Sequence, residues 1–190
     1  MIGLLLKHHM MEQCRLSKRK ENLEMARDGF LTIKNAKIFG RNFSGKEGKY
    51  NPEGRRNFCV YIEDIRDAEA MAADGWNIRW LEPRDETQER RAFLQVAVSF
   101  KNIPPKVVLV SKKGQTKLDE EEINMLDWAE IENIDLTINP SHWDVNGKQG
   151  IKAYLRSIYV TIYEDELDEL YSNVPDSAQS SITDDALPFD

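Results

Sequence analysis

The sequence predicts a mainly β protein, an antiparallel barrel with extra strands and two short helices. The chain contains seven or so short segments that predict strands, and in several of them apolar and polar residues alternate with a period of two, as expected for half-buried strands. Turn residues separate these segments, and strands do not alternate with long helices as they would in a parallel α/β sheet. With 190 residues, of which 41% are apolar and 31% charged, the chain can build one globular core.

The N-terminal half of the predicted fold begins at Phe30. Leu31 and Ile33 alternate with polar neighbours, whereas the glycine-rich stretch 40–56 has no period and predicts a long loop. Gly75 follows an alanine-rich segment and predicts the end of a short helix. The predicted elements are, in order, a strand over 31–39, the loop over 40–56, a strand over 58–62, a helix over 67–74 and a strand over 76–81.

The C-terminal half contains the clearest strand signal, because Leu94, Val96 and Val98 alternate strictly with their neighbours. Asp119 and Glu122 have the spacing of a capping box, which predicts the start of a helix. The predicted elements are a strand over 93–100, a strand over 107–110, a basic turn at 112–114, a helix over 119–128, a strand over 131–138 and a final strand over 151–163.

A hairpin is predicted before the final strand, because Asn146-Gly147 favours the two-residue turn that connects antiparallel strands. Within that strand the apolar residues change parity between Leu155 and Ile158. A β-bulge near Arg156 and Ser157 would point both sets in one direction, as expected where a strand bends around a small barrel.

Residues 1–28 have neither a helical nor a strand period and are predicted to form a disordered leader. The run Lys18-Arg19-Lys20-Glu21 would be purine-rich in its codons, like a ribosome-binding site, shortly before Met25. One hypothesis is that translation starts at Met25 in vivo; the other is that the leader is a real but disordered basic arm. Residues 29–163 are predicted to form the folded domain, and residues 164–190 a flexible tail.

The C-terminal tail carries much of the negative charge. Residues 164–190 hold nine of the 33 acidic residues and no Lys or Arg, so the rest of the chain has 26 bases against 24 acids. A mildly basic body favours binding of a polyanion, with which a tethered acidic tail would compete. The tail ends in an apolar hook behind acidic residues, a form that suits docking to partner proteins. The predicted docking residues are Asp184, Asp185, Leu187, Pro188 and Phe189.

Charge is also unevenly distributed within the body. Residues 30–58 hold seven Lys or Arg against two Glu, and residues 99–117 hold five Lys and no acid, whereas residues 118–136 hold eight acids and no base. Cations can follow the phosphates of a single strand while exposed rings stack on its bases. The candidate nucleic-acid-binding residues are Lys37, Arg41, Phe43, Lys46, Lys49, Tyr50, Arg55, Arg56, Lys101, Lys106, Lys112, Lys113, Lys152, Tyr154 and Arg156.

The alternative is that these charges form only a solvated surface and that Phe43 or Tyr50 caps the core. The same two alternatives, a core residue or a residue that stacks on bases, apply to the four tryptophans. Trp76, Trp80 and Trp128 have apolar neighbours and are predicted to lie in the core, whereas Trp143, near the hairpin, is a candidate stacking residue.

The tail end Asp184-Asp185-Ala186-Leu187-Pro188-Phe189 is similar to the tail tips of bacterial and phage single-stranded-DNA-binding proteins, whose Pro-Phe end docks on replication and repair partners. The body segments 41–48 and 57–60 resemble phage and prophage proteins of that role with an OB-fold core. The resemblance covers about residues 29–190. Because Asp190 follows Phe189, a pocket that grips the carboxylate of a terminal Phe would not find that group here.

The resemblance implies an OB-fold-like, sequence-independent single-stranded-DNA-binding protein. Such a protein coats and protects single-stranded DNA (ssDNA) in phage replication and recombination, recruits partners through its acidic tail, and works in the cytoplasm of an infected or lysogenic bacterium. A homo-oligomer is left open. Cys14 and Cys59 lack CxxC spacing, and the chain has no signal peptide or membrane span, which also favours the cytoplasm.

No enzyme activity, cofactor or metal is predicted. The patterns GxxxxGK[ST], HExxH and GxSxG are absent, and His142 is the only histidine of the predicted fold. The acidic run 119–122 is better explained by a helix N-terminus than by a metal site, because consecutive helical carboxylates point in different directions. The alternatives are a metal-dependent nuclease or other enzyme of phage DNA metabolism, and a β-rich virion structural protein.

Overall fold

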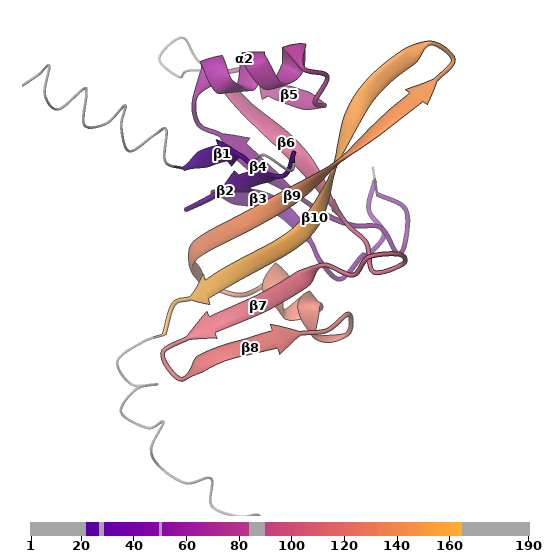
Figure 1. Cartoon of the computed structure of the whole chain (residues 1–190). Coiled ribbons are helices and arrows are strands. Elements are labelled where there is room, and N and C mark those ends of the chain that lie inside the picture. The colour runs from indigo at the N-terminus through magenta and orange to yellow at the C-terminus, as the bar shows by residue number, and fades with distance from the viewer. Residues whose placement is uncertain (1–21, 27–28, 50, 84–89, 165–190) are drawn as a thin grey trace, which may run out of the picture.

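The computed structural model describes residues 22–26, 29–49, 51–83 and 90–164. Strands dominate this part of the chain, as predicted, and two short helices accompany them (Figure 1). The elements are β1 (Leu23–Met25), β2 (Leu31–Ile33), β3 (Ile38–Asn42), β4 (Arg56–Ile62), α2 (Ile65–Ala73), β5 (Ile78–Leu81), β6 (Arg91–Val98), β7 (Lys106–Ser111), β8 (Gly114–Leu118), the 3-10 helix η1 (Glu122–Asp127), β9 (Ile131–Val145) and β10 (Lys148–Ile162).

The strands form one sheet in the order β1-β2-β9-β10-β6-β4-β3, with β5 added to β6, and β7 and then β8 added to β10. Most pairs are antiparallel, but β10 runs parallel to β6 at Ala153 and Tyr154 and parallel to β7 over 157–161. The strand path does not return on itself, so the sheet is open rather than a closed barrel. The mainly β class is confirmed. The sheet departs from the predicted antiparallel barrel in two ways: the described end strands β1 and β3 do not pair with each other, and β10 pairs in parallel with β6 and β7.

The predicted hairpin and bulge are both present in β9 and β10. Asn146 and Gly147 have φ values of 53° and 76°, as a tight turn with two left-handed residues requires. The pairing of β10 with β9 shifts between Leu155 and Ser157, at the predicted bulge. Both strands extend further than predicted, and their exposed outer ends project from the body as a two-stranded arm (Figure 1).

The N-terminal strands differ from the prediction. The expected strand over 31–39 is divided into β2 and β3 at Asn35, whose φ is 49° and whose N–H donates to an oxygen of Asp135. Structure also begins before Phe30, because β1 pairs with β2. A long-range bond to Asp135 and a three-residue strand leave no periodic signal in the sequence, so neither feature was predicted.

The two helices are shorter or shifted relative to the prediction. α2 begins at Ile65 because Asp64 accepts a hydrogen bond from the Arg66 N–H, two residues before the expected start. The second helix is a 3-10 helix over Glu122–Asp127 rather than an α-helix over 119–128. Its capping box is nevertheless formed, because Asp119 and Glu122 each accept from the backbone N–H of the other. Helix η1 buries Ile123 and Leu126, a spacing that suits three residues per turn.

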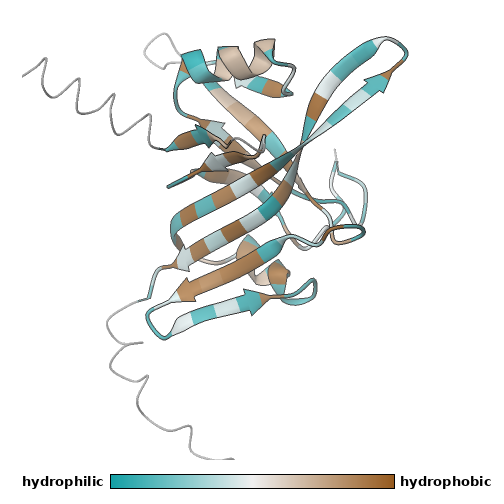
Figure 2. Ribbon diagram, in the orientation of Figure 1, coloured by the Kyte–Doolittle hydropathy of each residue, from teal (hydrophilic) through white to brown (hydrophobic). Residues whose placement is uncertain are grey.

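The core lies on one side of the strands. Figure 2 shows hydrophobic residues alternating with polar ones along β9 and β10, and the buried members include Leu136, Ile138, Ala153 and Leu155. Because neighbouring side chains of a strand point to opposite faces, the intervening residues form a second, partly exposed face. We call this second face of β3, β4, β6 and β10 the outer sheet face.

Candidate nucleic-acid interface

Cross-strand register makes the outer sheet face continuous. Tyr154 on β10 lies beside Ala97 on β6, which in turn lies beside Asn57 on β4. Two residues along, Gln95 pairs with Cys59, and Cys59 pairs with Phe39 on β3. Paired residues of adjacent strands point to the same side of a sheet, so all these side chains share one surface.

Three aromatic residues form a cluster on this face. The rings of Phe39 and Tyr61 are stacked with centroids 4.4 Å apart, and Phe93 meets Phe39 edge-on at 5.3 Å. The Arg91 guanidinium carbon lies 5.1 Å from the Tyr61 ring centroid. All three rings are half-buried, so the strands hold them in place while part of each ring remains accessible. We call Phe39, Tyr61 and Phe93 the aromatic cluster.

Three predicted binding residues, Lys152, Tyr154 and Arg156, lie close together on β10, with Arg156 at the bulge. The Lys152 ammonium lies 4.8 Å from the Tyr154 ring centroid, and the Arg156 guanidinium carbon lies 3.9 Å from that of Phe30. Lys152 and Arg156 are exposed. Lys152 and Tyr154 keep a regular register with β9, whereas Arg156 is the residue without a β9 partner in the bulge between Leu155 and Ser157.

A fourth predicted cation, Lys106 on β7, continues the same arrangement beyond the bulge. Its ammonium donates to the Tyr159 hydroxyl at 2.8 Å and lies 5.1 Å from the ring centroid. Lys106 and Ser157 are partners in the parallel β7–β10 ladder, so this pair adjoins the Arg156 region. Cation and ring therefore occur side by side at several positions from β6 to β7.

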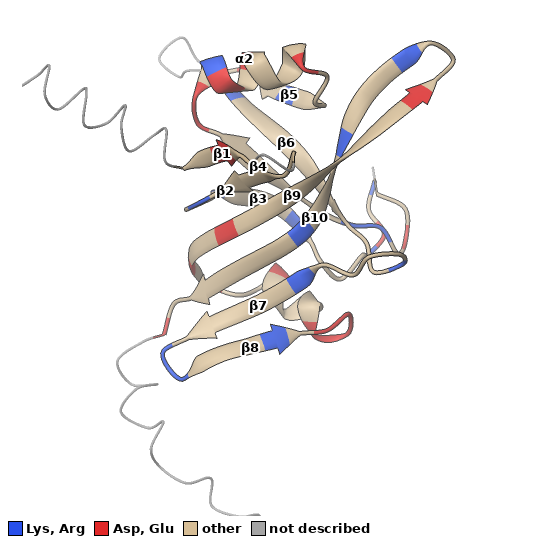
Figure 3. Ribbon diagram, viewed as in Figure 1, with Lys and Arg blue, Asp and Glu red and all other residues tan. Residues whose placement is uncertain are grey.

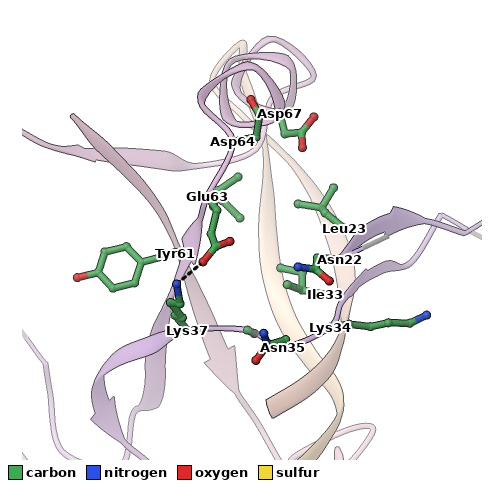
Figure 4. A pocket seen from close by; sticks show the side chains of 12 residues that line it. Asn22, Leu23, Ile33, Lys34, Asn35, Lys37, Tyr61, Glu63, Asp64 and Asp67 are labelled. Atoms are coloured by element: carbon green, nitrogen blue, oxygen red, sulfur yellow. Dashed lines mark ion pairs between the residues drawn. The ribbon is translucent and has the colours of Figure 1, made fainter. Parts of the chain in front are cut away.

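Lys37 lies at the border of this face, beside a small pocket of about 40 Å³ between β2, β4 and the start of α2 (Figure 4). Its ammonium pairs with Glu63 at 2.7 Å. Asp64 and Asp67 line the same pocket. The predicted cation is thus exposed but already paired with a carboxylate, which weakens its attraction for phosphate.

The predicted stacking role of Phe43 is wrong. Its side chain is fully buried and stacks on Phe58, with ring centroids 5.3 Å apart. The Asp127 carboxylate fixes this position, because its two oxygens accept from the backbone N–H groups of Phe43 at 2.6 Å and Ser44 at 3.0 Å. A ring held in the core in this way cannot reach a base, and the alternative that Phe43 caps the core is confirmed.

Arg41 and Arg56 are also held by other groups of the protein. The Arg41 guanidinium donates to the carbonyl oxygens of Leu126 and Ala129 at 3.0 and 2.9 Å, so it joins β3 to η1. Arg56 pairs with Glu120 at 2.6 Å, and its side chain is mostly buried. We assign both residues to the fold rather than to a nucleic-acid surface, because their charge is neutralised or directed at backbone carbonyls.

The remaining predicted residues are not brought together in one place. Six of the predicted cations are exposed, in the β3–β4 loop, after β6 and at the β7–β8 turn: Lys46, Lys49, Arg55, Lys101, Lys112 and Lys113. Tyr50 and the docking residues Asp184, Asp185, Leu187, Pro188 and Phe189 lie outside the described residues.

The tryptophans depart from the prediction at one position. Trp76 is buried and Trp80 half-buried, but Trp128 is 81% exposed, beside η1 and 5.8 Å from the Lys46 ammonium. Trp143 is 44% exposed, and a Cβ placed on Gly150 would lie 2.7 Å from its ring. The ring therefore lies on the facing glycine, which only a residue without a side chain permits.

Sequence reasoning missed the aromatic cluster and Arg91. Tyr61 and Phe93 alternate with core residues in their strands, as Tyr61 does between Val60 and Ile62. Parity of that kind places these two rings opposite the core. The density of Lys and Arg along the chain instead favours the loop 40–56 over strands whose cations and rings come from distant segments.

Cys59 lies within the outer sheet face, between Phe39 and Gln95. Burial raises the pKa of its thiol above the ordinary value, and the nearby Arg79 guanidinium lowers it by a smaller amount. In the described residues we find no group of three or more His, Cys, Asp or Glu side chains that could hold a metal ion. No helix within those residues is long and apolar enough to cross a membrane.

A family model described as "Putative phage ssDNA-binding domain" matches residues 20–188. The chain belongs to this family. The match includes the sheet, η1 and most of the tail region, so ssDNA is the ligand and ssDNA binding the function of the chain. No curated protein sequence matches it.

Solved structures support the fold. The single-stranded DNA-binding protein from bacteriophage Enc34 in complex with ssDNA matches with a TM-score of 0.52 and 13% identity, over 76% of this chain and 92% of that one. A second structure of the Enc34 protein matches with a TM-score of 0.51 and 12% identity, over 76% and 87%. At such identity the likeness concerns the fold alone, and it confirms the predicted OB-fold-like class.

Proposed function

We propose that this protein binds ssDNA on the outer sheet face, without regard to base sequence. The observation that carries the proposal is the aromatic cluster with Arg91, held on rigid strands and continued by the cation–ring pairs of β10. Exposed ring faces accept any base, and neighbouring cations contact the phosphates that every nucleotide carries. This arrangement suits a protein that coats single strands of varied sequence.

The strands give this surface an energetic advantage over a loop. A ring already fixed by packing loses little side-chain entropy when a base stacks on it, so most of the stacking energy of about 1–3 kcal/mol per base is retained as affinity. Arg91, Lys152 and Arg156 lie within 5.1 Å of a ring centroid. A phosphate and a base of one nucleotide can therefore be contacted together.

We further propose that the acidic tail regulates access and recruits partners. Residues 164–190 hold nine acidic side chains and no Lys or Arg. Tethered near a cationic face, they compete with DNA for the same charges, and the Leu187-Pro188-Phe189 tip serves as a docking peptide for phage replication and recombination proteins. The site of action is the cytoplasm of the bacterial cell. A chain ending at Glu164 is expected to bind ssDNA more tightly at low salt, and equal affinity would reject the competition.

The direct test of the function is a titration of labelled oligo(dT), a mixed-sequence single strand and the matching duplex at two salt concentrations. We expect both single strands to bind with similar affinity, duplex to bind more weakly, and affinity to fall with salt. Strong preference for one single-strand sequence would contradict the proposed mode. Loss of labelled DNA over time, dependent on a divalent cation, would instead support a nuclease.

A further inference from the structure

β8 forms a free edge of the sheet. It pairs with β7 on one side, and no other described strand pairs with it. Residues 114–117 are exposed, and Figure 1 shows β8 as the outermost strand beyond β7. Figure 2 shows that this strand is largely hydrophilic. A partner strand would therefore bind this edge through backbone hydrogen bonds and charge rather than through apolar burial.

The register of the β7–β8 hairpin fixes which backbone groups face the free side. A two-residue turn joins the strands, so the flanking pair Ser111 and Gly114 is hydrogen-bonded. In an antiparallel pair such bonded positions recur at every second residue. The N–H and C=O groups of Gln115 and Lys117 consequently point away from β7, toward a position that another strand can occupy.

Charges of opposite sign flank β8. Lys112 and Lys113 precede the strand, and Asp119 and Glu120 follow it. Figure 3 shows the basic turn at one end of β8 and the acidic loop at the other. An antiparallel copy of the same strand reverses this order, so the basic end of one copy meets the acidic end of the other.

One register satisfies both the hydrogen bonds and the charges. If two β8 strands pair about a two-fold axis at Thr116, Gln115 faces Lys117 of the copy and Lys113 faces Asp119. The groups that point outward then bond to one another, and opposite charges meet at both ends. Centring on Lys117 would oppose two lysines, and centring on Gln115 would oppose Lys117 to Lys113, so like charges disfavour both neighbouring registers.

We propose that the protein forms a symmetric dimer by antiparallel pairing of β8 with β8 of a second copy, centred on Thr116. The pairing joins the two sheets and repeats every contact twice, as a two-fold interface requires. Because β8 is not one of the strands of the outer sheet face, the pairing does not use that face in either copy. The proposal concerns the protein without DNA and does not depend on where ssDNA binds.

The first test measures mass by sedimentation equilibrium of the full chain at low salt. We expect a species of twice the 22.0 kDa chain mass that dissociates on dilution. Gln115→Pro removes an N–H that points away from β7, so it should abolish the dimer while the monomer stays folded. Gln115→Ala keeps that N–H and should still dimerise. A monomeric wild-type chain at high concentration, or a dimer unaffected by Gln115→Pro in a folded protein, would overturn the proposal.

The second test reads the register directly. In the proposed pairing Thr116 faces its own copy at a non-hydrogen-bonded position, where Cα atoms are about 4.5 Å apart and a disulfide can form. Thr116→Cys should therefore give a covalent dimer under mild oxidation. Lys117→Cys, which faces Gln115 of the copy, and the wild-type chain with Cys14 and Cys59 should give little. Cross-linking of Lys117→Cys in preference to Thr116→Cys would refute the register.

The third test uses charge. Lys113→Glu places two acids opposite one another at both ends of the interface and should weaken dimerisation about tenfold. Asp119→Asn retains a side chain that can cap η1, and adding it to Lys113→Glu should recover most of that loss. No recovery would contradict the contact. If the full chain is monomeric and only a chain ending at Glu164 dimerises, the tail rather than a second copy occupies the edge, and the proposal fails for the full chain.

Discussion

The outer sheet face and the loop between β3 and β4 both combine rings with cations, yet the fold uses them differently. In the loop, Phe43 is buried, and the adjoining strand residues Arg41 and Arg56 are bound to η1 and to Glu120. On the sheet, the aromatic cluster remains accessible and Arg91 lies against it. The density of suitable residues along the chain is therefore a weaker guide to a binding surface than their direction relative to the core.

The largest expected effect is on stability, at Phe43, where a change in folding and a change in ssDNA binding can be measured separately. Replacing this buried ring in Phe43→Ala should lower the free energy of unfolding by about 3–5 kcal/mol, because a cavity replaces packing against Phe58. Urea denaturation measures the change. The ssDNA affinity of the protein that remains folded should be unchanged. A stable variant with weak ssDNA binding would show instead that Phe43 contacts ssDNA.

A smaller effect is expected at the aromatic cluster. Tyr61→Leu keeps apolar bulk but removes the ring, so ssDNA affinity should fall by about 1–3 kcal/mol, or about 5- to 150-fold in Kd. Fluorescence anisotropy with oligo(dT) measures this change. The matched control is Trp128→Leu, which removes an aromatic ring that is 81% exposed but lies off this face. A larger loss for Trp128→Leu than for Tyr61→Leu would shift the interface toward the loop.

The salt dependence of binding distinguishes the cations. Arg91→Gln should reduce the slope of log K against log salt by about 0.7, the value expected for one phosphate contact on a single strand. Lys37→Gln should leave the slope nearly unchanged, because Lys37 already pairs with Glu63 at 2.7 Å. Equal reductions for the two variants would show that charge alone, without position on the face, controls binding.

The smallest effect concerns the thiol of Cys59, studied in a Cys14→Ser background. Because burial raises its pKa, little thiolate is present near pH 8, and alkylation by iodoacetamide should be slower than for a free thiol. Bound ssDNA should slow the alkylation further by covering the outer sheet face.

The contribution of the Cys59 thiol to stability is present below the ordinary thiol pKa and is lost as the pH rises through the raised pKa. Alkylation at the rate of a free thiol, equal with and without DNA, would contradict this placement.

Local signals predicted the fold well where neighbouring residues decide the structure. The alternation in β6, the Asn146-Gly147 turn and the bulge after Leu155 were all readable from the sequence. The parallel pairing of β10 with β6 and β7, and the break at Asn35, depend on residues far apart in the chain. No local period encodes such contacts, so these features were not predicted.

The binding surface was predicted only in part, for the same reason. Lys152, Tyr154 and Arg156 were found because they lie at alternate positions of one strand. Phe43 was misassigned because the bonds from Asp127 that fix it span more than 80 residues. The aromatic cluster draws on three strands, and only their register brings Phe39, Tyr61 and Phe93 together.

The most direct test of the central claim is photo-cross-linking of the full chain to oligo(dT) that contains 5-iododeoxyuridine, followed by mass spectrometry of the modified peptides. If ssDNA lies on the outer sheet face, the adducts should map to Tyr61, Phe93 and Tyr154, and Tyr61→Leu should remove those at β4. Adducts confined to the loop 43–55 and Trp128 would contradict the account.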